Sequence, residues 1–348
     1  MVKREKDMKV VRFYGSRDIR IEEEEKRDLT EDEVRVKILW CGICDSDVLE
    51  FISGPTLYKK DKPIIPGHEC GGVVIEKGEK VEKVEEGDKV YMSPLIYCGE
   101  CKNCNRGREN ICYNGGYLGF TEDGGFREEI ILKERNLYRA DPDIKPHILP
   151  FAQEVAVSVH ASLKGIGEKF LVVGNNSTSL ILSQILKDMG GDVHISMLER
   201  GGRDIIEKFG FKLFDEENED EKFDTVFDVV DSGPEIGMGK DPLSFSLSHV
   251  DRGGKLVVVG IHTLPVSLNF LDILSRELDI DTSYEYTPLD FERAIDLIES
   301  EKIVVEPLIT KKILLKDIEE EGFVELETNK KEQVKILVTP FEEVLNES

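Results

Sequence analysis

Two patterns of apolar and polar residues divide the chain. Between about Lys9 and Lys133, short alternating segments such as VRVKIL, GGVVIE and DKVYMS are separated by Gly, Pro and acidic turn residues, and this alternation predicts half-buried β-strands. From about Phe170 to Ser283, strand-length apolar runs alternate with amphipathic segments, as in FLVVG, SLILSQILKDMG, DVHISM and RDIIEKFG. That order predicts parallel strands joined by crossover helices on both faces of a sheet. The remainder, with FERAIDLIESEK and QVKILVTP, has mixed character and can rejoin the first region.

Length and charge narrow the function classes. A chain of 348 residues predicts two domains, and its 40% hydrophobic residues suffice for both cores. With 46 basic and 71 acidic residues the net charge is -25, so nucleic acid and anionic membrane surfaces are disfavoured partners. No apolar run approaches the ~20 residues that span a bilayer. We therefore expect a cytoplasmic protein that binds small molecules or other subunits.

Four of the seven cysteines lie within one short segment. Cys98, Cys101, Cys104 and Cys112 are separated by two, two and seven residues. The short gaps turn successive thiolates inward, and the longer gap returns the chain to complete a tetrahedron around Zn²⁺. Because no position stays open for a substrate, this spacing predicts a structural zinc site. A disulfide pair or an iron–sulfur cluster are the alternatives, and nothing else in the sequence indicates electron transfer.

Two further fragments, WCGICDSD and PGHEC, carry metal-binding side chains at the edges of β segments. Cys44 offers a thiolate and His68 an imidazole, a pair that suits zinc, with Asp47 and Glu69 as supporting carboxylates or a direct oxygen ligand. A single Cys and His so far apart in a sequence are more often core residues. Their neighbouring motifs decide between the two interpretations.

Those motifs are GICDSD, PGHECGGVV, VEEGDKVYMSP, the four-cysteine segment ending in NRGRENIC, DGGFREE, and the downstream strand–helix alternation. In order and spacing, the chain resembles the zinc-dependent medium-chain dehydrogenases/reductases, which act on alcohols, polyols, threonine and sugars. The resemblance implies an α/β protein. It places a GroES-like β-rich catalytic domain with two zinc sites in residues 1–155 and 296–348, and a Rossmann NAD(P)-binding domain with a doubly wound parallel sheet in residues 156–295.

The resemblance also implies individual roles around the second zinc site. Cys44 and His68 match the catalytic zinc ligands, and Ser46 matches the hydroxyl of the proton relay. Asp47 matches the carboxylate that orients His68. Glu69 matches the acidic residue that either stays beside the ligand histidine or moves to bind the metal.

The third protein ligand has two candidates. Relatives of the polyol type carry Glu-Pro before the helix that follows, and in the stretch AQEVAVSVHA the alignment puts Gln153 at the Glu position. A shift by one residue makes Glu154 the ligand instead. We favour Gln153, because it stands at the aligned Glu position. An oxygen from either side chain can bind zinc. Cys41 and Cys70 match no ligand position and are interpreted as small buried residues.

The stretch GNNSTS replaces the usual glycine-rich dinucleotide turn, G-x-G-x-x-G. Gly174 keeps the first glycine, which makes the bend. Asn176 takes the second position; Asn tolerates positive φ and its amide can donate to a phosphate. Ser179 is small enough for the third position, and Ser177 begins the helix whose N-terminus favours an anion. The stretch therefore predicts an altered cofactor loop.

A second departure follows the next strand, in DVHISMLERGGR. Met197 stands where an NAD-binding relative has a carboxylate for the ribose hydroxyls. Arg200 and Arg203 follow and can hold a 2′-phosphate, so we favour NADP over NAD. Glu199, in a shifted register, would support NAD instead.

These features predict a zinc-dependent NAD(P) oxidoreductase that catalyses reversible hydride transfer between an alcohol, such as a polyol or sugar, and a nicotinamide cofactor. Zinc in an open site is a Lewis acid that lowers the pKa of a bound oxygen. The alternatives are a second zinc that only holds the fold, and a binding or regulatory protein with a degenerate cofactor site. The sequence does not name the substrate, and the resemblance implies a homo-dimer or homo-tetramer.

Overall fold

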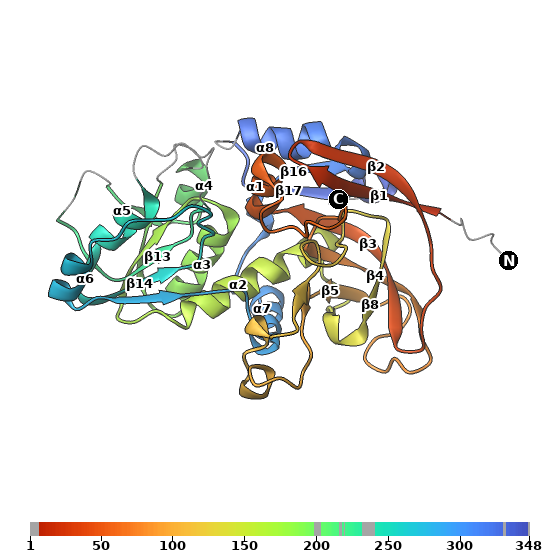
Figure 1. The fold of residues 1–348 in the computed structure, drawn as a ribbon, viewed down its shortest axis with the longest axis horizontal. Coiled ribbons are helices and arrows are strands. Elements are labelled where there is room, and N and C mark those ends of the chain that lie inside the picture. The colour runs from red at the N-terminus through yellow and green to blue at the C-terminus, as the bar shows by residue number, and fades with distance from the viewer. Residues whose placement is uncertain are drawn as a thin grey trace. The chain divides into compact units, whose positions relative to one another are not determined.

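The computed structural model describes residues 7–197, 203–215, 218, 220–231, 241–329 and 332–346. Contacts divide the chain into two compact units. Unit 1 comprises Met1–Gln153, Ile309–Asn329 and Lys335–Ser348, and unit 2 comprises Glu154–Leu308 and Lys330–Val334. Figure 1 labels many of their helices and strands.

Unit 1 is built on β-sheet, as the alternating pattern predicts. Its larger sheet has, in the described part of the chain, seven strands in the order β16-β17-β3-β4-β5-β9, with β8 also paired to β3. All pairs are antiparallel except β16 with β17. The strands are β3 (Glu33–Ile43), β4 (Glu69–Lys77), β5 (Lys89–Met92), β8 (Glu129–Lys133), β9 (Leu137–Arg139), β16 (Ile309–Leu314) and β17 (Lys335–Thr339).

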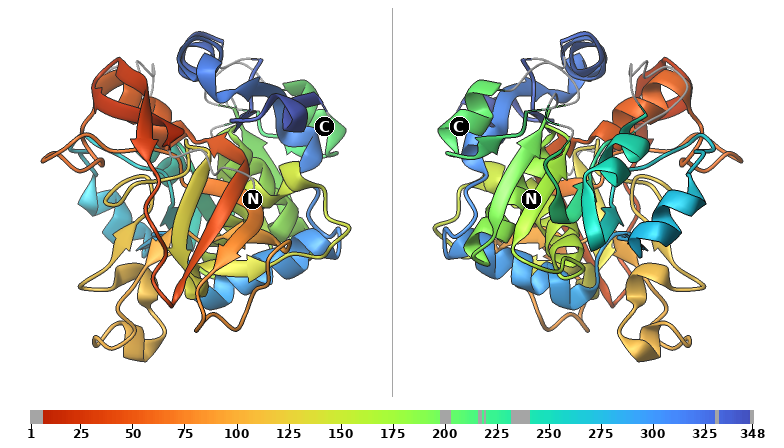
Figure 2. Two further views of the ribbon diagram at one scale, coloured as in Figure 1. Left: turned by 90° about the vertical axis from the view of Figure 1, so that its right-hand side faces the viewer. Right: turned by 90° about the vertical axis from the view of Figure 1, so that its left-hand side faces the viewer.

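Smaller elements complete unit 1. A hairpin of β1 (Asp7–Gly15) and β2 (Asp18–Glu25) and a short pair of β6 (Leu95–Ile96) and β7 (Gly116–Tyr117) form two further sheets. The α-helices are α1 (Asp45–Ser53), α8 (Glu325–Thr328) and α9 (Glu342–Asn346). The segment between β6 and β7, drawn in tan, projects from the rest of this unit as a small lobe (Figures 1 and 2).

Strand β3 positions much of the candidate chemistry. Val34, Val36, Ile38 and Trp40 are at most 1% exposed, so one set of alternating side chains is fully buried, as the period of two requires. This strand pairs with β17, β4 and β8. Its carboxyl end leads directly into α1, and so the core of the sheet fixes where α1 begins.

Unit 2 contains a parallel sheet in the order β12-β11-β10-β13-β14-β15. The strands are β10 (Lys169–Val173), β11 (Asp192–Ser196), β12 (Lys212–Leu213), β13 (Phe223–Asp228), β14 (Val250–Val258) and β15 (Asp279–Thr282). Numbered within the unit, this is the order 3-2-1-4-5-6 of a dinucleotide-binding fold, in which the strand order reverses beside β10. The predicted α/β architecture is confirmed.

The helices of unit 2 lie where the amphipathic segments predict them. They are α2 (Ala152–Ser162), which begins at the unit boundary, α3 (Ser177–Asp188), α4 (Arg203–Lys208), α5 (Pro242–Ser248), α6 (Phe270–Arg276) and α7 (Pro288–Glu299). Among the described helices, none has the length and apolar character needed to cross a membrane.

The boundaries of the units differ in detail from the expected domain boundaries. The sequence indicated divisions after residues 155 and 295, whereas the units divide after residues 153 and 308. Residue 295 lies inside α7, which buries Phe291, Ala294 and Ile298 on one face. Because a helix packs as one body through such a face, the whole of α7 stays with unit 2.

Candidate metal centres and cofactor site

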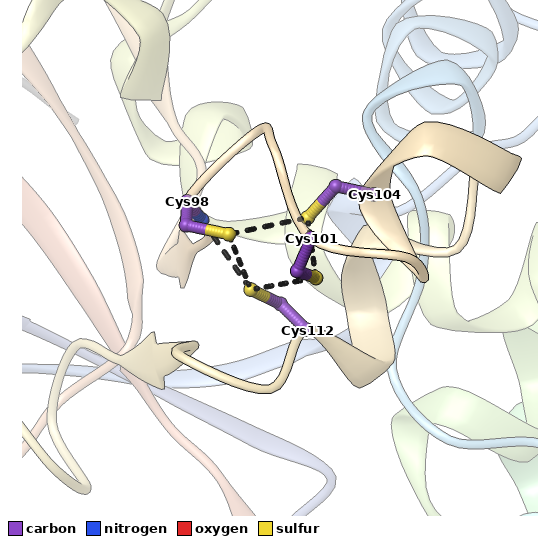
Figure 3. A group of neighbouring side chains, drawn as sticks. All are labelled: Cys98, Cys101, Cys104 and Cys112. Carbon is purple, nitrogen blue, oxygen red and sulfur yellow. Dashed lines mark hydrogen bonds between the residues drawn. The ribbon is translucent and has the colours of Figure 1, made fainter.

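The four clustered cysteines converge in the small lobe of unit 1. Cys98 and Cys101 lie in the loop after β6, Cys104 begins one short 3₁₀ helix and Cys112 follows another. Figure 3 shows the four sulfur atoms turned toward one another. Neighbouring Sγ atoms are 3.4 Å apart for Cys98 and Cys112, 3.5 Å for Cys101 and Cys104, 3.8 Å for Cys101 and Cys112, and 3.9 Å for Cys98 and Cys104.

These spacings fit a zinc ion held by four thiolates. A tetrahedron with Zn–S bonds of about 2.3 Å has sulfur atoms about 3.8 Å apart. A disulfide would instead bring two sulfurs to about 2.05 Å, and all four cysteines are free. The described side chains therefore provide a closed set of four donors of the kind that structural zinc uses.

The backbone of the lobe prepares two of these thiols for metal binding. Backbone N–H groups, first that of Cys104 and then that of Tyr113, lower the pKa of Cys101 to about 6. N–H groups of Glu100 and Cys101 lower the pKa of Cys98 as well. Burial raises the pKa of Cys104 to about 12. A cation in the centre would supply the charge that stabilises this last thiolate.

A second group of donors forms at the carboxyl end of β3. One ligand atom each from Cys44, His68 and Glu69 lies within 4.8 Å of the others. Cys44 is the N-cap of α1, and its backbone N–H donates to the carboxylate of Asp47 at 3.1 Å. His68 and Glu69 lie at the start of β4, opposite this helix N-terminus, because Gly42 pairs with Glu69 in the sheet. Thiolate, imidazole and carboxylate are ligands that zinc accepts in open sites.

Asp47 connects this group to a buried tyrosine. Its Oδ1 lies 3.6 Å from Nδ1 of His68 and accepts a hydrogen bond of 2.7 Å from the hydroxyl of Tyr58. Asp47 is fully buried, and burial together with the Asp47 charge raises the pKa of Tyr58 well above its usual value. Tyr58 therefore remains a donor, and Asp47 presents its carboxylate to the imidazole, as expected of an orienting residue.

Glu69 has a buried cationic partner. Both carboxylate oxygens of Glu69 accept hydrogen bonds from Nζ of Lys335, at 2.8 and 2.9 Å. The two side chains are only 1–2% exposed, and Lys335 comes from β17, on the other side of β3. Lys335 thus neutralises the charge of Glu69 beside the metal-binding group. Such an ion pair is retained where its geometry satisfies both charges.

Aromatic rings surround His68, and a serine lies close in sequence to Cys44. The ring of Phe120 lies 4.9 Å from that of His68 between centroids, and the ring of Tyr117 lies 5.9 Å away. Ser46 is buried in the first turn of α1, two residues after Cys44. Two aromatic rings thus pack close to the imidazole, which also faces the carboxylate of Asp47.

The two candidates for a third ligand have different partners. Nε2 of Gln153 donates a hydrogen bond of 2.9 Å to the hydroxyl of Tyr117. The ring of Tyr117 packs near that of His68 in unit 1. Oε1 of Glu154 accepts hydrogen bonds from the hydroxyls of Ser177 at 2.5 Å and Thr178 at 3.3 Å, at the start of α3 in unit 2. The structure thus brings Gln153 to the aromatic surroundings of His68 and gives Glu154 partners on α3.

The altered turn after β10 keeps the backbone that a dinucleotide needs. Gly174 has φ of +132°, which strongly favours glycine, and a Cβ there would lie 3.4 Å from the carbonyl oxygen of Val229. α3 begins directly after this turn, so its first N–H groups lie at the carboxyl edge of the sheet, beside the point where strand order reverses. A helix N-terminus at this edge of the sheet is a position that suits an anionic group such as a pyrophosphate.

Asn176 differs from its expected role. Its φ is -82°, so it does not use the left-handed region. Its Oδ1 accepts from the N–H of Ser179 at 2.9 Å, which makes it the N-cap of α3, and its amide donates to the carbonyl of Val229 at 3.1 Å. One hydrogen of the amide is therefore engaged by the backbone of unit 2. The tendency of Asn to cap helices outweighs its tolerance of positive φ here.

The other predicted cofactor residues have varied surroundings. Ser179 is fully buried, in agreement with a packing role, and Ser177 is buried against Glu154. Met197 is half-buried at the end of β11. Arg203 is exposed and lies 3.8 Å from Glu207, one turn further along α4. Arg200, and with it Glu199, lies outside the described residues.

Sequence reasoning missed Tyr58 and Lys335. Lys335 interrupts the apolar run of QVKILVTP, and a lysine at a core position of a strand requires a buried anion. That signal indicates a partner without naming it. Tyr58 lies in the loop after α1 and carries no comparable signal, because tyrosine is frequent in loops and in cores alike.

Comparisons with known proteins agree with this geometry. Residues 30–142 match the family model described as the alcohol dehydrogenase GroES-like domain. The (R,R)-butanediol dehydrogenase of Bacillus subtilis is 28% identical over 351 residues, which cover 96% of this chain and 100% of that protein. The sorbitol dehydrogenase of the same species is 26% identical over 348 residues, covering 96% and 98%.

Solved structures show the same likeness. The crystal structure of 2R,3R-butanediol dehydrogenase from Bacillus subtilis has a TM-score of 0.83 at 27% identity, covering 96% of this chain and 100% of that one. Galactitol-1-phosphate dehydrogenase from Escherichia coli has a TM-score of 0.84 at 23% identity, covering 96% and 100%, and supports the fold alone. The domain model over residues 30–142, the relatives that match over nearly the whole chain and the two groups of zinc-type donors together support the zinc-dependent medium-chain dehydrogenase/reductase family for this chain.

Proposed function

We propose that this protein is a zinc-dependent oxidoreductase that transfers hydride reversibly between an alcohol, of the polyol or sugar type, and NAD(P). The observation that carries the proposal is the group of Cys44, His68 and Glu69, backed by Asp47 and separate from the four-cysteine lobe. A protein that used zinc only to hold its fold would need only the four-cysteine site. It would not need a second, incomplete group of zinc ligands next to the rings of Phe120 and Tyr117. The relatives, named as butanediol and sorbitol dehydrogenases, indicate the substrate class.

Different residues of unit 1 have different roles in such a reaction. Zinc held by Cys44 and His68 would supply a Lewis acid that lowers the pKa of a substrate hydroxyl. Asp47 fixes the orientation of the His68 ring, and the Ser46 hydroxyl relays the substrate proton, passing its own proton on as it takes up that of the substrate. Phe120 and Tyr117 provide an apolar surface that excludes water from the reacting carbon.

An activity assay tests the proposal. The zinc-loaded protein is expected to reduce a nicotinamide cofactor with vicinal diols, such as butane-2,3-diol, or with sugar alcohols, and Ser46→Ala is expected to lower kcat by about a hundredfold. Ser53→Ala, at the opposite end of the same helix, is the matched control and should retain full activity. Absence of hydride transfer with both NAD and NADP across the panel would reject the enzyme in favour of a binding protein.

We propose two zinc ions per chain, with Gln153 as a further ligand of the catalytic ion. The hydrogen bond from Gln153 to Tyr117 supports this choice, since Glu154 is engaged by Ser177. Gln153→Ala should lower the affinity for one zinc ion, and Glu154→Ala should leave both affinities unchanged. Loss of zinc from Glu154→Ala alone would reverse the assignment.

We propose NADP as the preferred cofactor, because Met197 offers no carboxylate to the ribose hydroxyls. The exposed side chain of Arg203 supports this preference, since its guanidinium can leave the ion pair with Glu207 and bind a phosphate. Titration of nicotinamide fluorescence with NADH and NADPH compares the two affinities. Arg203→Ala should weaken NADPH binding alone. Tighter binding of NADH by the unchanged protein would overturn the preference.

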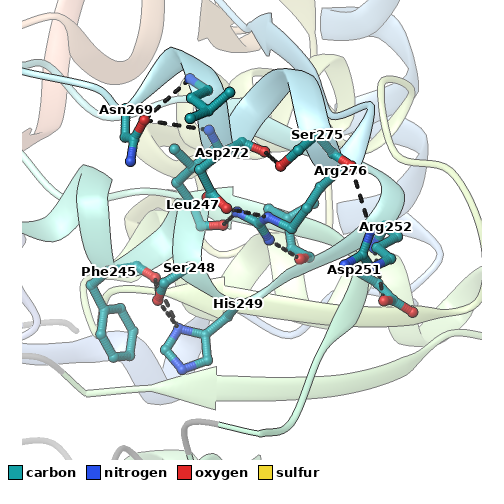
Figure 4. Close-up of polar contacts among 12 residues, drawn as sticks. Phe245, Leu247, Ser248, His249, Asp251, Arg252, Asn269, Asp272, Ser275 and Arg276 are labelled. Atoms are coloured by element: carbon teal, nitrogen blue, oxygen red, sulfur yellow. Dashed lines mark hydrogen bonds and ion pairs between the residues drawn. The ribbon is translucent and has the colours of Figure 1, made fainter.

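We propose a cytoplasmic homo-oligomer that pairs through unit 2. Arg276 holds α6 in place. Its guanidinium donates hydrogen bonds to the carbonyls of Leu247 and Val250 and forms an ion pair with Asp272 (Figure 4). The same helix exposes three large apolar side chains, Phe270, Leu271 and Leu274, by 73–77%. β15 lies at the edge of the described sheet, and an edge strand can pair with its copy about a two-fold axis. The thiolate-rich lobe fits a reducing compartment.

A further inference from the structure

Two cysteines outside both metal groups meet in the core of unit 1. Cys41 on β3 and Cys70 on β4 are direct partners in the antiparallel sheet. Their Sγ atoms are 3.1 Å apart, and the residues are 1% and 6% exposed. Among the described residues, neither belongs to a group of three or more metal-binding side chains. The pair is therefore a buried dithiol and not part of a metal site.

The backbone already provides the geometry of a disulfide. Directly opposed residues of antiparallel strands have Cα atoms about 4.5–5.5 Å apart, inside the window of roughly 4.4–6.8 Å found for disulfides. Both side chains point to the same face of the sheet, with their sulfurs toward each other. The sulfurs need to approach by only about 1 Å to bond.

Glycines on neighbouring segments make room for this pair. A Cβ at Gly125 would lie 2.0 Å from Sγ of Cys70, and a Cβ at Gly67 would lie 2.9 Å from Sγ of Cys41. Any larger residue at these two positions would push the sulfurs away. The close approach of the two thiols is thus built into the packing around them.

We infer that Cys41 and Cys70 form a redox-convertible pair, which a peroxide oxidises to a cross-strand disulfide without rearrangement of the sheet. One sulfur attacks a peroxide oxygen and loses its proton, giving a sulfenic acid and one water. The second sulfur then displaces the sulfenic oxygen, which leaves with that thiol's proton as a second water. Two electrons pass from the sulfurs to the peroxide, and a reducing dithiol reverses the change.

The position of the pair gives the bond a structural consequence. Cys41 lies three residues before Cys44, and Cys70 follows His68 and Glu69 directly. A disulfide would tie together the two strand ends that carry the candidate catalytic ligands. It would also close a loop between cysteines 29 residues apart, which restricts the unfolded chain and stabilises the folded one.

Peptide mapping of the peroxide-treated, zinc-loaded protein tests this inference. After acid quenching, alkylation and trypsin digestion, we expect a cross-link between peptides 38–59 and 61–77, which dithiothreitol removes. Because the first peptide also holds Cys44, fragmentation must place the bond at Cys41. Cys44→Ser should retain the cross-link, and Cys41→Ser and Cys70→Ser should each abolish it.

Thermal unfolding gives a second measurement. Oxidation should raise the melting temperature of the unchanged protein by about 5 °C relative to the equally treated Cys41→Ser and Cys70→Ser variants. Recovery of both cysteines as alkylated thiols after full peroxide treatment would overturn the inference, as would a cross-link through Cys44. Because the cross-link is read on the unchanged chain, this result stands even if a variant folds poorly. It is also independent of whether the protein transfers hydride.

Discussion

At the scale of single residues, the candidate catalytic group depends on two buried contacts that orient its members. Asp47 faces His68, and Lys335 binds Glu69 through both carboxylate oxygens. The GICDSD and PGHEC motifs predict Cys44, Asp47, His68 and Glu69 from the sequence. They do not predict Lys335, because its partner is 266 residues away and their contact arises only when β17 pairs with β3.

Replacement of Lys335 should destabilise unit 1. Lys335→Met keeps the length of the side chain and removes its charge, which leaves Glu69 buried without its cation. Breaking such a pair from one side costs about 3–5 kcal/mol, so the melting temperature should fall by several degrees. Lys316→Met, at an exposed pair with Glu342, should change it little. Equal melting temperatures for both variants would contradict the role given to Lys335.

Asp47→Asn tests the orientation of His68. The amide keeps the shape of the side chain and removes the charge that faces the imidazole, so zinc affinity at this site should fall about 10–100-fold. Tyr58→Phe removes only the hydrogen bond to Asp47 and should have a smaller effect in the same direction. Zinc titration against a competing chelator measures both. An unchanged affinity in Asp47→Asn would exclude the orienting role.

His262 should make the stability of unit 2 depend on pH. Its hydrogen bond to the buried carboxylate of Asp228 raises the pKa of His262 above the usual 6.5. A raised pKa means that protonation stabilises the folded state. This stabilisation is complete below about pH 6.5 and disappears as the pH rises through the raised value. The loss of melting temperature in His262→Asn should therefore be larger at about pH 5.5 than at pH 9, and a loss independent of pH would contradict the ion pair.

At the scale of elements, hydrophobic periodicity predicted the strand–helix order of unit 2, because each strand and helix there buries one continuous apolar surface. The details of the turn after β10 were not predictable in the same way. Asn176 is the N-cap of α3 and does not adopt the left-handed conformation. This arrangement depends on the hydrogen bond from its amide to the carbonyl of Val229, which β13 brings alongside.

Asn176→Ala should weaken both α3 and cofactor binding. Loss of the cap costs about 1 kcal/mol and removes the hydrogen bonds that fix the turn, to the N–H of Ser179 and the carbonyl of Val229. Asn269 caps α6 in the same way, through the N–H groups of Leu271 and Asp272, so Asn269→Ala is a matched control. Both variants should lose similar thermal stability, and only Asn176→Ala should bind NADPH more weakly, as measured by fluorescence titration. Equal NADPH affinity in the two variants would separate the turn from the cofactor.

At the scale of the whole molecule, the two-unit organisation follows from the change of hydrophobic pattern along the chain, and its boundaries do not. A change of composition indicates where strands give way to helices. The return of the C-terminal part to unit 1 was expected from the sequence, and only packing shows that the whole of α7 stays with unit 2. The oligomeric state is harder still to predict from the sequence, because it depends on which apolar side chains remain exposed after folding.

Leu274→Glu should dissociate the proposed oligomer. Leu274 is 77% exposed, so a charge there leaves the folded chain intact. Burial of a leucine is worth about 2 kcal/mol, and two-fold symmetry applies the loss twice. The resulting 4 kcal/mol weakens association about a thousandfold. Tyr113→Glu, which alters a side chain of unit 1 that is 70% exposed, should leave the mass unchanged in light scattering. A monomeric unchanged protein, or an intact oligomer in Leu274→Glu, would contradict pairing through α6.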